Sequence, residues 1–281
     1  MSDSLAALLT ALTDDELIIG HRHSEWTGFA PHIEEDVAFS SIAQDEIGHA
    51  AAYYARLAKL DNDSDADVLA LGRDAAGYRN AVICERPNGD WSYTLARHWL
   101  YDAADSVRLE ALESSADHEL AALATKMRRE ERYHLLHADA WMRRVATGPV
   151  EGRALLIASL ESAFAESAGL FEPIEEEEAA VEAGWLPAPS HELRARFLAR
   201  AAESLEEWGL PAEVHAGLDR SAEFVASSSG DLIAGRDRAG KDSPASSHPA
   251  LGGRRGRHSE DFKPLWDEMT STYRSDPGAA W

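Results

Sequence analysis

Two Glu-x-x-His pairs carry the clearest chemical signal in the sequence. Glu46 and His49 lie in AQDEIGHA, and Glu131 and His134 lie in REERYHLLH. This spacing places both side chains of a pair on one helix face. In a helical bundle, two such pairs and one acid from each of two further helices can hold two metal ions. About one pair is expected by chance in a glutamate-rich chain with 12 histidines, so the placement of both pairs deep in long helices carries the prediction.

Acidic residues on apolar helix faces are the remaining candidate ligands. Glu16 follows Leu12 on one apolar stripe, and Asp102 follows Trp99 on another. A buried carboxylate needs a cation or a hydrogen-bond donor, and we favour the ligand role for Asp102 over that of a hydrogen-bonded acid. Glu16 has an equally good alternative, because Thr13 and Glu16 match a capping box at a helix start. The candidate metal ligands are therefore Glu46, His49, Asp102, Glu131 and His134, with Glu16 either a sixth ligand or part of a helix cap.

Three more acids are predicted to support the site without binding metal directly: Asp45, Asp105 and Glu130. Asp45 and Glu130 precede the glutamates of the two pairs and point about 100° away on the helix, where they can bond to ligands or form salt bridges. Asp105 is expected beside the ligands or in solvent. Ordinary hydrogen-bonding roles are expected for the other histidines considered, which are His21, His23, His32, His98 and His137.

These residues can meet only if the chain folds as a bundle. Apolar residues recur at spacings of three and four up to Trp208, and Ala, Leu, Glu and Arg dominate, which is typical of helices. Short connections make consecutive long helices antiparallel. The sequence therefore predicts an all-α fold built on a four-helix bundle. We expect its helices at residues 13–26, 32–60, 90 or 92 to 114, and 117–146, with additional helices at 150–171, 190–208 and 260–274.

The chain is predicted to divide into a helical domain, residues 1–226 with a core bundle at about 13–146, and a linker with a C-terminal tail, residues 227–281. The tail is expected to pack on the bundle or on a partner. Its first part, residues 227–257, is rich in Ser, Gly, Arg and Pro and should be extended or partly disordered. The basic run GGRRGRH offers Arg254, Arg255 and Arg257 to CoA phosphates or to an acidic partner, and a solvated linker is an equal alternative.

Composition excludes several classes of function. The formal net charge of −23 opposes binding to nucleic acid. The sequence has no uncharged apolar run of about eighteen residues and no basic segment before an apolar one at its start, so we predict neither a membrane span nor a secretory signal. A single cysteine, Cys84, fits the cytoplasm and is expected to be a buried apolar side chain.

Several separated stretches resemble one known family. They are GHRHSEWTGFAP, ERPNGDWSYTLARHWLYDA, EERYHLLHADAW, and the tail GGRRGRHSEDF ending in PGAAW. Together they are similar to the C subunit of the bacterial ring 1,2-phenylacetyl-CoA epoxidase. The resemblance implies a ferritin-like bundle within a multicomponent monooxygenase. In that family the di-iron site lies in a similar, catalytic A subunit, the C subunit usually serves as a scaffold, and a separate reductase subunit brings electrons from NADPH.

The sequence departs from this family at the candidate ligands. Typical C subunits have a stretch like LDLLGQ where this chain has QDEIGH, which looks like the version in the catalytic A subunit. REERYH likewise resembles the catalytic KEESFH at Glu131 and His134, and WLYDA resembles WLVDG at Asp102. The separation of Glu16 and Glu46 also matches the family's spacing, which favours Glu16 as a ligand. Either a di-metal centre is retained here, or these residues persist as a buried ion-paired network.

The candidate ligands and the family resemblance together lead to three alternative hypotheses for the function. The first is a subunit of the epoxidase, assembled with the A subunit and other subunits, acting on an aromatic acyl-CoA, and carrying its own di-iron or manganese centre. The second is a scaffold without cofactor that stabilises the A subunit. The third is a separate ferritin-like metalloprotein that stores iron or oxidises another substrate. A homodimer is an additional possibility.

Overall fold

The computed structural model describes residues 2–61, 64–211, 214, 250–276 and 279. All regular structure in these residues is helical, so the predicted all-α, ferritin-like bundle is confirmed. The segment predicted to be extended or partly disordered, residues 227–257, lies outside the described residues as far as residue 249. Its last part was predicted wrongly, because Gly253–Arg255 forms a 3-10 turn in which Arg254 is buried.

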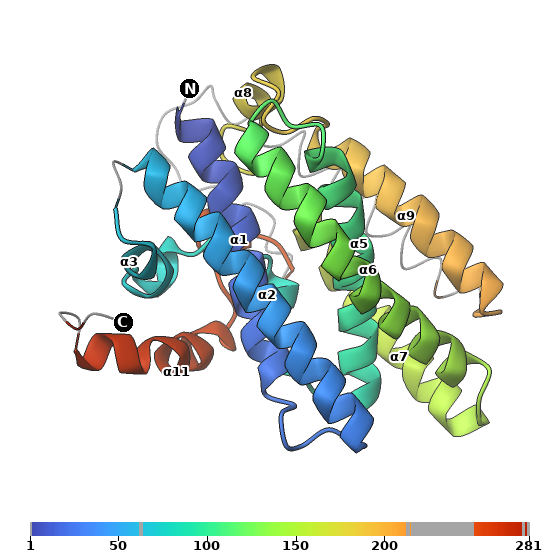
Figure 1. Ribbon diagram of the computed structural model, residues 1–281. Coiled ribbons are helices and arrows are strands. Elements are labelled where there is room, and N and C mark those ends of the chain that lie inside the picture. The colour runs from blue at the N-terminus through green and yellow to red at the C-terminus, as the bar shows by residue number, and fades with distance from the viewer. Residues whose placement is uncertain (1, 62–63, 212–213, 215–249, 277–278, 280–281) are drawn as a thin grey trace, which may run out of the picture.

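Four long helices form the bundle, as Figure 1 shows. Helices α1 and α2 form one antiparallel hairpin, and α5 and α6 form the other. Short connections enforce this arrangement. The bounds are α1 Ser2–Ser24, α2 Ile33–Leu60, α5 Trp91–Leu112 and α6 His118–Ala146.

Helix α1 begins eleven residues before the predicted start at Thr13. Thr13 does not cap the helix, because its Oγ1 donates to the carbonyl of Ala50 in α2 at 2.9 Å. The predicted capping box is therefore wrong. Because Leu5 and Leu9 are buried, the helix already runs through the residues before TDDE and continues across them. Glu16 consequently lies in mid-helix, where a cap cannot account for its carboxylate.

Smaller helices surround the bundle. They are α3 Ala66–Leu71, α4 Val82–Glu85, α7 Val150–Ser167, α8 Glu177–Glu182, α9 Ser190–Glu207 and α11 Phe262–Ser275, with 3-10 turns at Ala75–Gly77, Ala168–Phe171 and Gly253–Arg255. Helices α7 and α9 both pack on α5, and α11 lies beside α3. The additional helices predicted at 150–171, 190–208 and 260–274 are thus present within a few residues.

The segment Val150–Phe171, which includes α7, is long and apolar enough to cross a membrane by length and composition alone. Half of its most apolar 18-residue stretch is buried inside the protein. A core helix of a soluble protein can have the same length and composition. The segment is weak evidence for a membrane span.

Helices α1 and α2 approach closely at Gly20. A Cβ built at this residue would lie 2.9 Å from Ile47 Cγ1 and 3.2 Å from the Cβ of Glu46. By contrast, a Cβ built at Gly48, in the middle of α2, would meet nothing within 4 Å. Gly20 therefore permits the helix contact that places Glu46, whereas Gly48 has no such role inside this chain.

We expect Gly20→Ala and Gly48→Ala to change stability in opposite directions. Overpacking at Gly20 should lower the free energy of unfolding by about 1–3 kcal/mol. At Gly48, alanine changes only the helix propensity and should raise the free energy of unfolding by about 0.5–1 kcal/mol. Urea unfolding followed by circular dichroism measures both, and equal effects would contradict the close approach at Gly20.

Candidate metal centre

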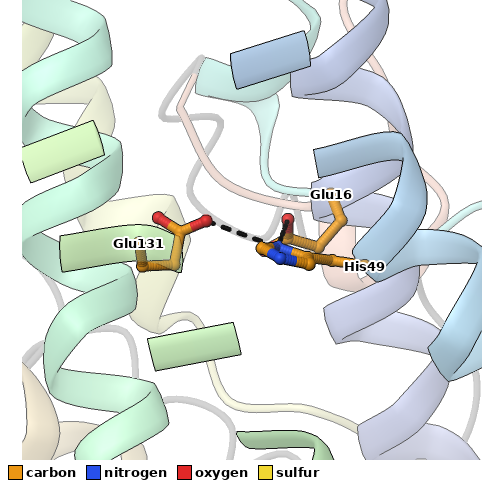
Figure 2. Close-up of side chains that lie close together, drawn as sticks. All are labelled: Glu16, His49 and Glu131. Atoms are coloured by element: carbon orange, nitrogen blue, oxygen red, sulfur yellow. Dashed lines mark ion pairs between the residues drawn. The ribbon is translucent and has the colours of Figure 1, made fainter. Parts of the chain in front are cut away.

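Glu16, His49 and Glu131 offer ligand atoms that lie within 4.8 Å of one another. They come from α1, α2 and α6, and their side chains converge between the helices in Figure 2. His49 Nδ1 lies 3.4 Å from Glu16 Oε2 and 3.3 Å from Glu131 Oε1. All three residues are buried. The structure thus brings together residues that are 33 and 82 positions apart in the sequence.

His134 completes the second Glu-x-x-His pair at the same level. Its Nδ1 lies 3.1 Å from Glu131 Oε1, so this carboxylate stands between two imidazoles. The rings of His49 and His134 are nearly parallel, with centroids 6.5 Å apart. A carboxylate between two imidazoles has the arrangement needed to bridge two cations.

The other two predicted ligands each contact a different histidine. Glu46 accepts from His23 Nδ1 at 2.8 Å, and Asp102 Oδ2 lies 3.2 Å from His98 Nδ1. All four of these side chains are fully buried. Four predicted ligands therefore cluster directly, while Glu46 and Asp102 border the cluster against imidazoles.

His23 and His98 were not predicted as partners of the site. Two signals could have identified them. His23 lies two helical turns after Glu16 on the same face, and His98 lies one turn before Asp102. A third histidine, His137, contacts Phe39, as do His23 and His98, and the three imidazoles surround this phenylalanine.

The acids beside the two pairs reach across to the opposite helix. Glu130 of α6 lies 2.9 Å from His49 Nε2, and Asp45 of α2 lies 3.2 Å from His134 Nε2. Each acid thus contacts the histidine of the other pair. With Nε2 of each histidine held by an acid, both Nδ1 atoms lie toward the carboxylates, so Asp45 and Glu130 are placed where acids that support metal ligands would lie.

Asp105 is also buried, and it begins a chain of ion pairs. Arg108 contacts Asp105 at 2.9 Å and Asp15 at 2.6 Å. Asp15 in turn accepts from Arg254 at 2.7 Å. Burial raises the pKa of Asp105 to about 8, with Glu16 and Glu131 also raising it against the opposing charge of Arg108. Asp105 therefore connects the carboxylate cluster to the C-terminal part of the chain.

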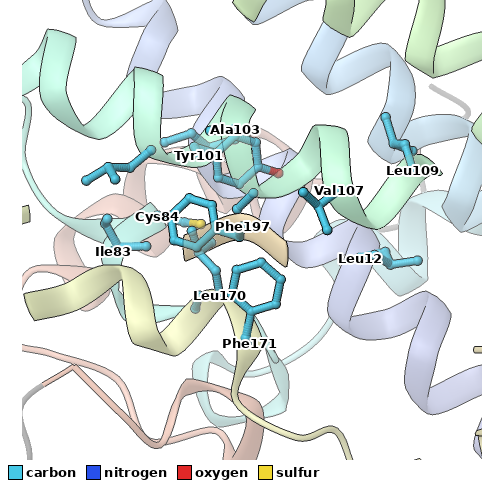
Figure 3. Packing of buried hydrophobic residues seen from close by; sticks show 14 of the residues in the cluster. Leu12, Ile83, Cys84, Tyr101, Ala103, Val107, Leu109, Leu170, Phe171 and Phe197 are labelled. Carbon is cyan, nitrogen blue, oxygen red and sulfur yellow. The ribbon is translucent and has the colours of Figure 1, made fainter. Parts of the chain in front are cut away.

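The prediction that Arg254 binds a phosphate or a partner is corrected by its burial. Arg254 is 3% exposed, and it also donates to the backbone carbonyls of Ala11, Arg79 and Leu170. Figure 3 shows the hydrophobic core around Leu170 and Cys84, where Cys84 is buried as predicted. Arg254 forms an ion pair with the buried Asp15, which would otherwise have too little positive charge beside it, so Arg254 is not available to a partner.

The two neighbouring arginines differ from Arg254. Arg255 is half-buried and donates to the carbonyl of Pro173 at 3.0 Å. Arg257 is exposed. Of the three arginines predicted to bind a partner or CoA phosphates, Arg257 alone has an exposed side chain.

We expect Arg254→Ala to lower the free energy of unfolding by about 3–5 kcal/mol, because it leaves Asp15 buried beside a single arginine. Arg255→Ala, the matched control, should cost about 1 kcal/mol. Burial raises the pKa of Asp15, but Arg254 and Arg108 lower it by more, so the pKa of this carboxyl lies below its usual value. The Asp15–Arg254 pair therefore stabilises the protein at neutral pH. This stabilisation is lost when the pH falls through the lowered pKa and Asp15 becomes protonated. Urea unfolding at neutral pH measures the difference. Equal losses for the two variants would contradict this role.

The centre of the bundle contains more negative than positive charge. Burial and the neighbouring Glu16 and Glu131 raise the pKa of Glu46 well above its usual range. Burial and Glu131 do the same for the pKa of Asp102. Burial lowers the pKa of His49, but its contacts with Glu131 and Glu16 outweigh this and raise it to about 12. Without metal, protons therefore compensate the buried carboxylates.

The donor atoms at this position fit a pair of divalent cations. Several buried atoms make no hydrogen bond to any described residue: Glu16 Oε2, both carboxylate oxygens of Asp102, both of Glu131, and His134 Nδ1. Carboxylate oxygens and imidazole nitrogens are suitable ligands for iron and manganese. Most of these atoms lie only at ion-pair distance from an opposite group, and Asp102 Oδ1 and Glu131 Oε2 have no ion-pair contact among the described residues either. Buried polar atoms without hydrogen bonds are costly, and metal ions would satisfy these.

Comparison with known proteins gives a consistent result. The chain is 29% identical over 279 residues to the C subunit of 1,2-phenylacetyl-CoA epoxidase from Escherichia coli (strain K12), an alignment that covers 99% of this chain and 100% of that protein. The sequence profile of the family described as phenylacetic acid catabolic protein matches residues 1–223. Because this match covers most of the chain, the protein belongs to the phenylacetic acid catabolic protein family.

Proposed function

We propose that this chain is a subunit of a phenylacetyl-CoA epoxidase and that it carries its own di-metal centre. The observation behind the metal centre is the convergence of Glu16, His49, Glu131 and His134 from three helices. The likeness to the C subunit of the Escherichia coli enzyme supports the assignment to an epoxidase. Its partners would be a catalytic A subunit, other epoxidase subunits, and a reductase subunit that uses NADPH.

Each predicted ligand has a definite role under this proposal. Glu131, His49, His134 and Glu16 would hold the two ions through their carboxylate oxygens and Nδ1 atoms. Glu46 and Asp102 would complete the set from their buried positions. Two bound irons would supply the oxygen-activating redox chemistry needed for epoxidation of the aromatic ring. The protein's own contribution is to keep this site dry and to hold both Nδ1 atoms toward the carboxylates.

A scaffold without metal is the second candidate, and it would need no substrate cavity beside the candidate ligands. One cavity of about 430 Å³ is lined by residues such as Thr10, Leu57 and Arg73, and another of about 540 Å³ by Glu176 and Trp185. Neither lining includes any of the six candidate ligands. Under this alternative the histidines and carboxylates form a buried ion-paired network that stabilises the bundle.

Metal analysis separates these candidates. The wild-type chain reconstituted with Fe(II) or Mn(II) should hold about two ions, and Glu131→Gln less than about half an ion, because it removes the bridging charge. Glu119→Gln, on the exposed part of the same helix, should behave as wild type. Uptake should increase as the pH is raised, because Glu46, Asp102 and His49 have raised pKa values and must lose protons before they bind. A wild-type content below about half an ion throughout would rule out the metal centre.

Activity in the assembled complex tests whether the centre turns over. The chain, the A subunit and the reductase are combined with phenylacetyl-CoA, NADPH and O₂, and epoxide formation is followed by mass spectrometry. With Glu131→Gln, turnover should fall at least about tenfold while the complex keeps its mass, since the effect of a lost ligand is of this order or larger. Unchanged turnover would assign the chain to the scaffold role.

A further inference from the structure

The outer face of α2 carries a single charged side chain, Asp45, over five helical turns. The residues classed as exposed between residues 37 and 55 are all uncharged: Val37, Ser41, Gln44, Gly48, Ala51 and Ala55. The whole chain has 50 acidic and 27 basic residues, so a face of this length with one partly exposed acid has unusually little charge. A helix that remained in water would usually carry charged residues there.

Large apolar side chains extend this face. Phe29 is 80% exposed, Ile33 75% and Val37 66%, and they follow one another into the start of α2. On the neighbouring helix α6, Tyr133 is 72% and Leu136 53% exposed. Helices α2 and α6 run side by side in Figure 1. We call the outer sides of these two helices, with Phe29, the α2/α6 face. A cluster of exposed large apolar residues marks an interaction site more often than a surface exposed to water.

Gly48 points to a close approach by another helix. Glycine in a helix interior is less stable than alanine, so it usually needs a reason. Inside this chain Gly48 has none, since a Cβ there would meet nothing within 4 Å. Its exposed position, flanked by Gln44 and Ala51 on the same face, leaves room for a second backbone to pack against α2.

Charge indicates the kind of partner. Arg129 on α6 is exposed, and no carboxylate among the described residues lies within ion-pair distance of it. Its neighbour in the sequence, Glu130, contacts His49 instead. Two copies of this chain, each of formal charge −23, repel each other, which disfavours a second copy as the partner. The face therefore suits a different chain that presents acids around an apolar helix.

We propose that the α2/α6 face is the docking surface for the catalytic A subunit, which inserts a helix along Gly48 and places carboxylates beside Arg129. This inference rests on the proposed function, because the epoxidase assignment supplies the partner. Docking there would cover Asp45 and Glu130, whose side chains are 44% and 37% exposed in the isolated chain. The partner would then remove from water the two acids that hold the candidate metal-binding histidines.

Binding of the full-length chain to the purified A subunit tests the docking surface, by biolayer interferometry. Gly48→Gln fills the space for the approaching helix, and Arg129→Glu reverses the charge. Each should weaken binding at least tenfold. The matched controls are Ala199→Gln and Arg196→Glu, exposed residues on α9, which should bind within twofold of wild type. Circular dichroism and metal content should be the same in all five proteins.

The outcomes distinguish this inference from the proposed function. If wild type binds the A subunit and the α2/α6 variants bind equally well, the docking surface is wrong and the epoxidase assignment stands. If wild type does not bind the A subunit at all, both are overturned. If light scattering finds a dimer of this chain alone that Gly48→Gln dissociates, the face belongs to a second copy and the choice of partner is wrong.

Discussion

Burial of several carboxylates inside one helical bundle is the constraint on which the rest of this structure depends. Carboxylates removed from water require positive charge or protons nearby. Here imidazoles from the same helices lie against the buried carboxylates. In addition, the raised pKa values of Glu46 and Asp102 favour their protonated, neutral forms. A bundle selected only for stability would place leucines at these positions, so the buried acids indicate a requirement other than packing.

The same electrostatic constraint extends to the C-terminal part of the chain. Arg254 reaches Asp15, which is directly adjacent to Glu16, and Arg108 continues the connection to Asp105. Since Asp15 cannot remain charged in the core without these arginines, the segment around Arg254 is part of the folded core. The position of α1, and with it the Glu16 carboxylate, depends on residues more than two hundred positions later in the sequence.

Sequence periodicity was sufficient to predict the four bundle helices and the meeting of two Glu-x-x-His pairs, because both follow from local helical geometry. The start of α1 was not predictable from the TDDE signal, since burial of the preceding leucines overrides a local cap. The role of Arg254 could not be predicted from the sequence either. A basic run in a polar segment is normally exposed, and its contact with Asp15 depends on the tertiary fold rather than on a local sequence pattern.

The reciprocal contacts of Asp45 and Glu130 have an evolutionary consequence. Each acid holds a histidine of the opposite helix, so losing one histidine leaves an acid on the other helix without its partner. Sequence change in α2 and α6 is therefore coupled at these positions: substituting His49 or His134 favours a second substitution, of Glu130 or Asp45, on the other helix.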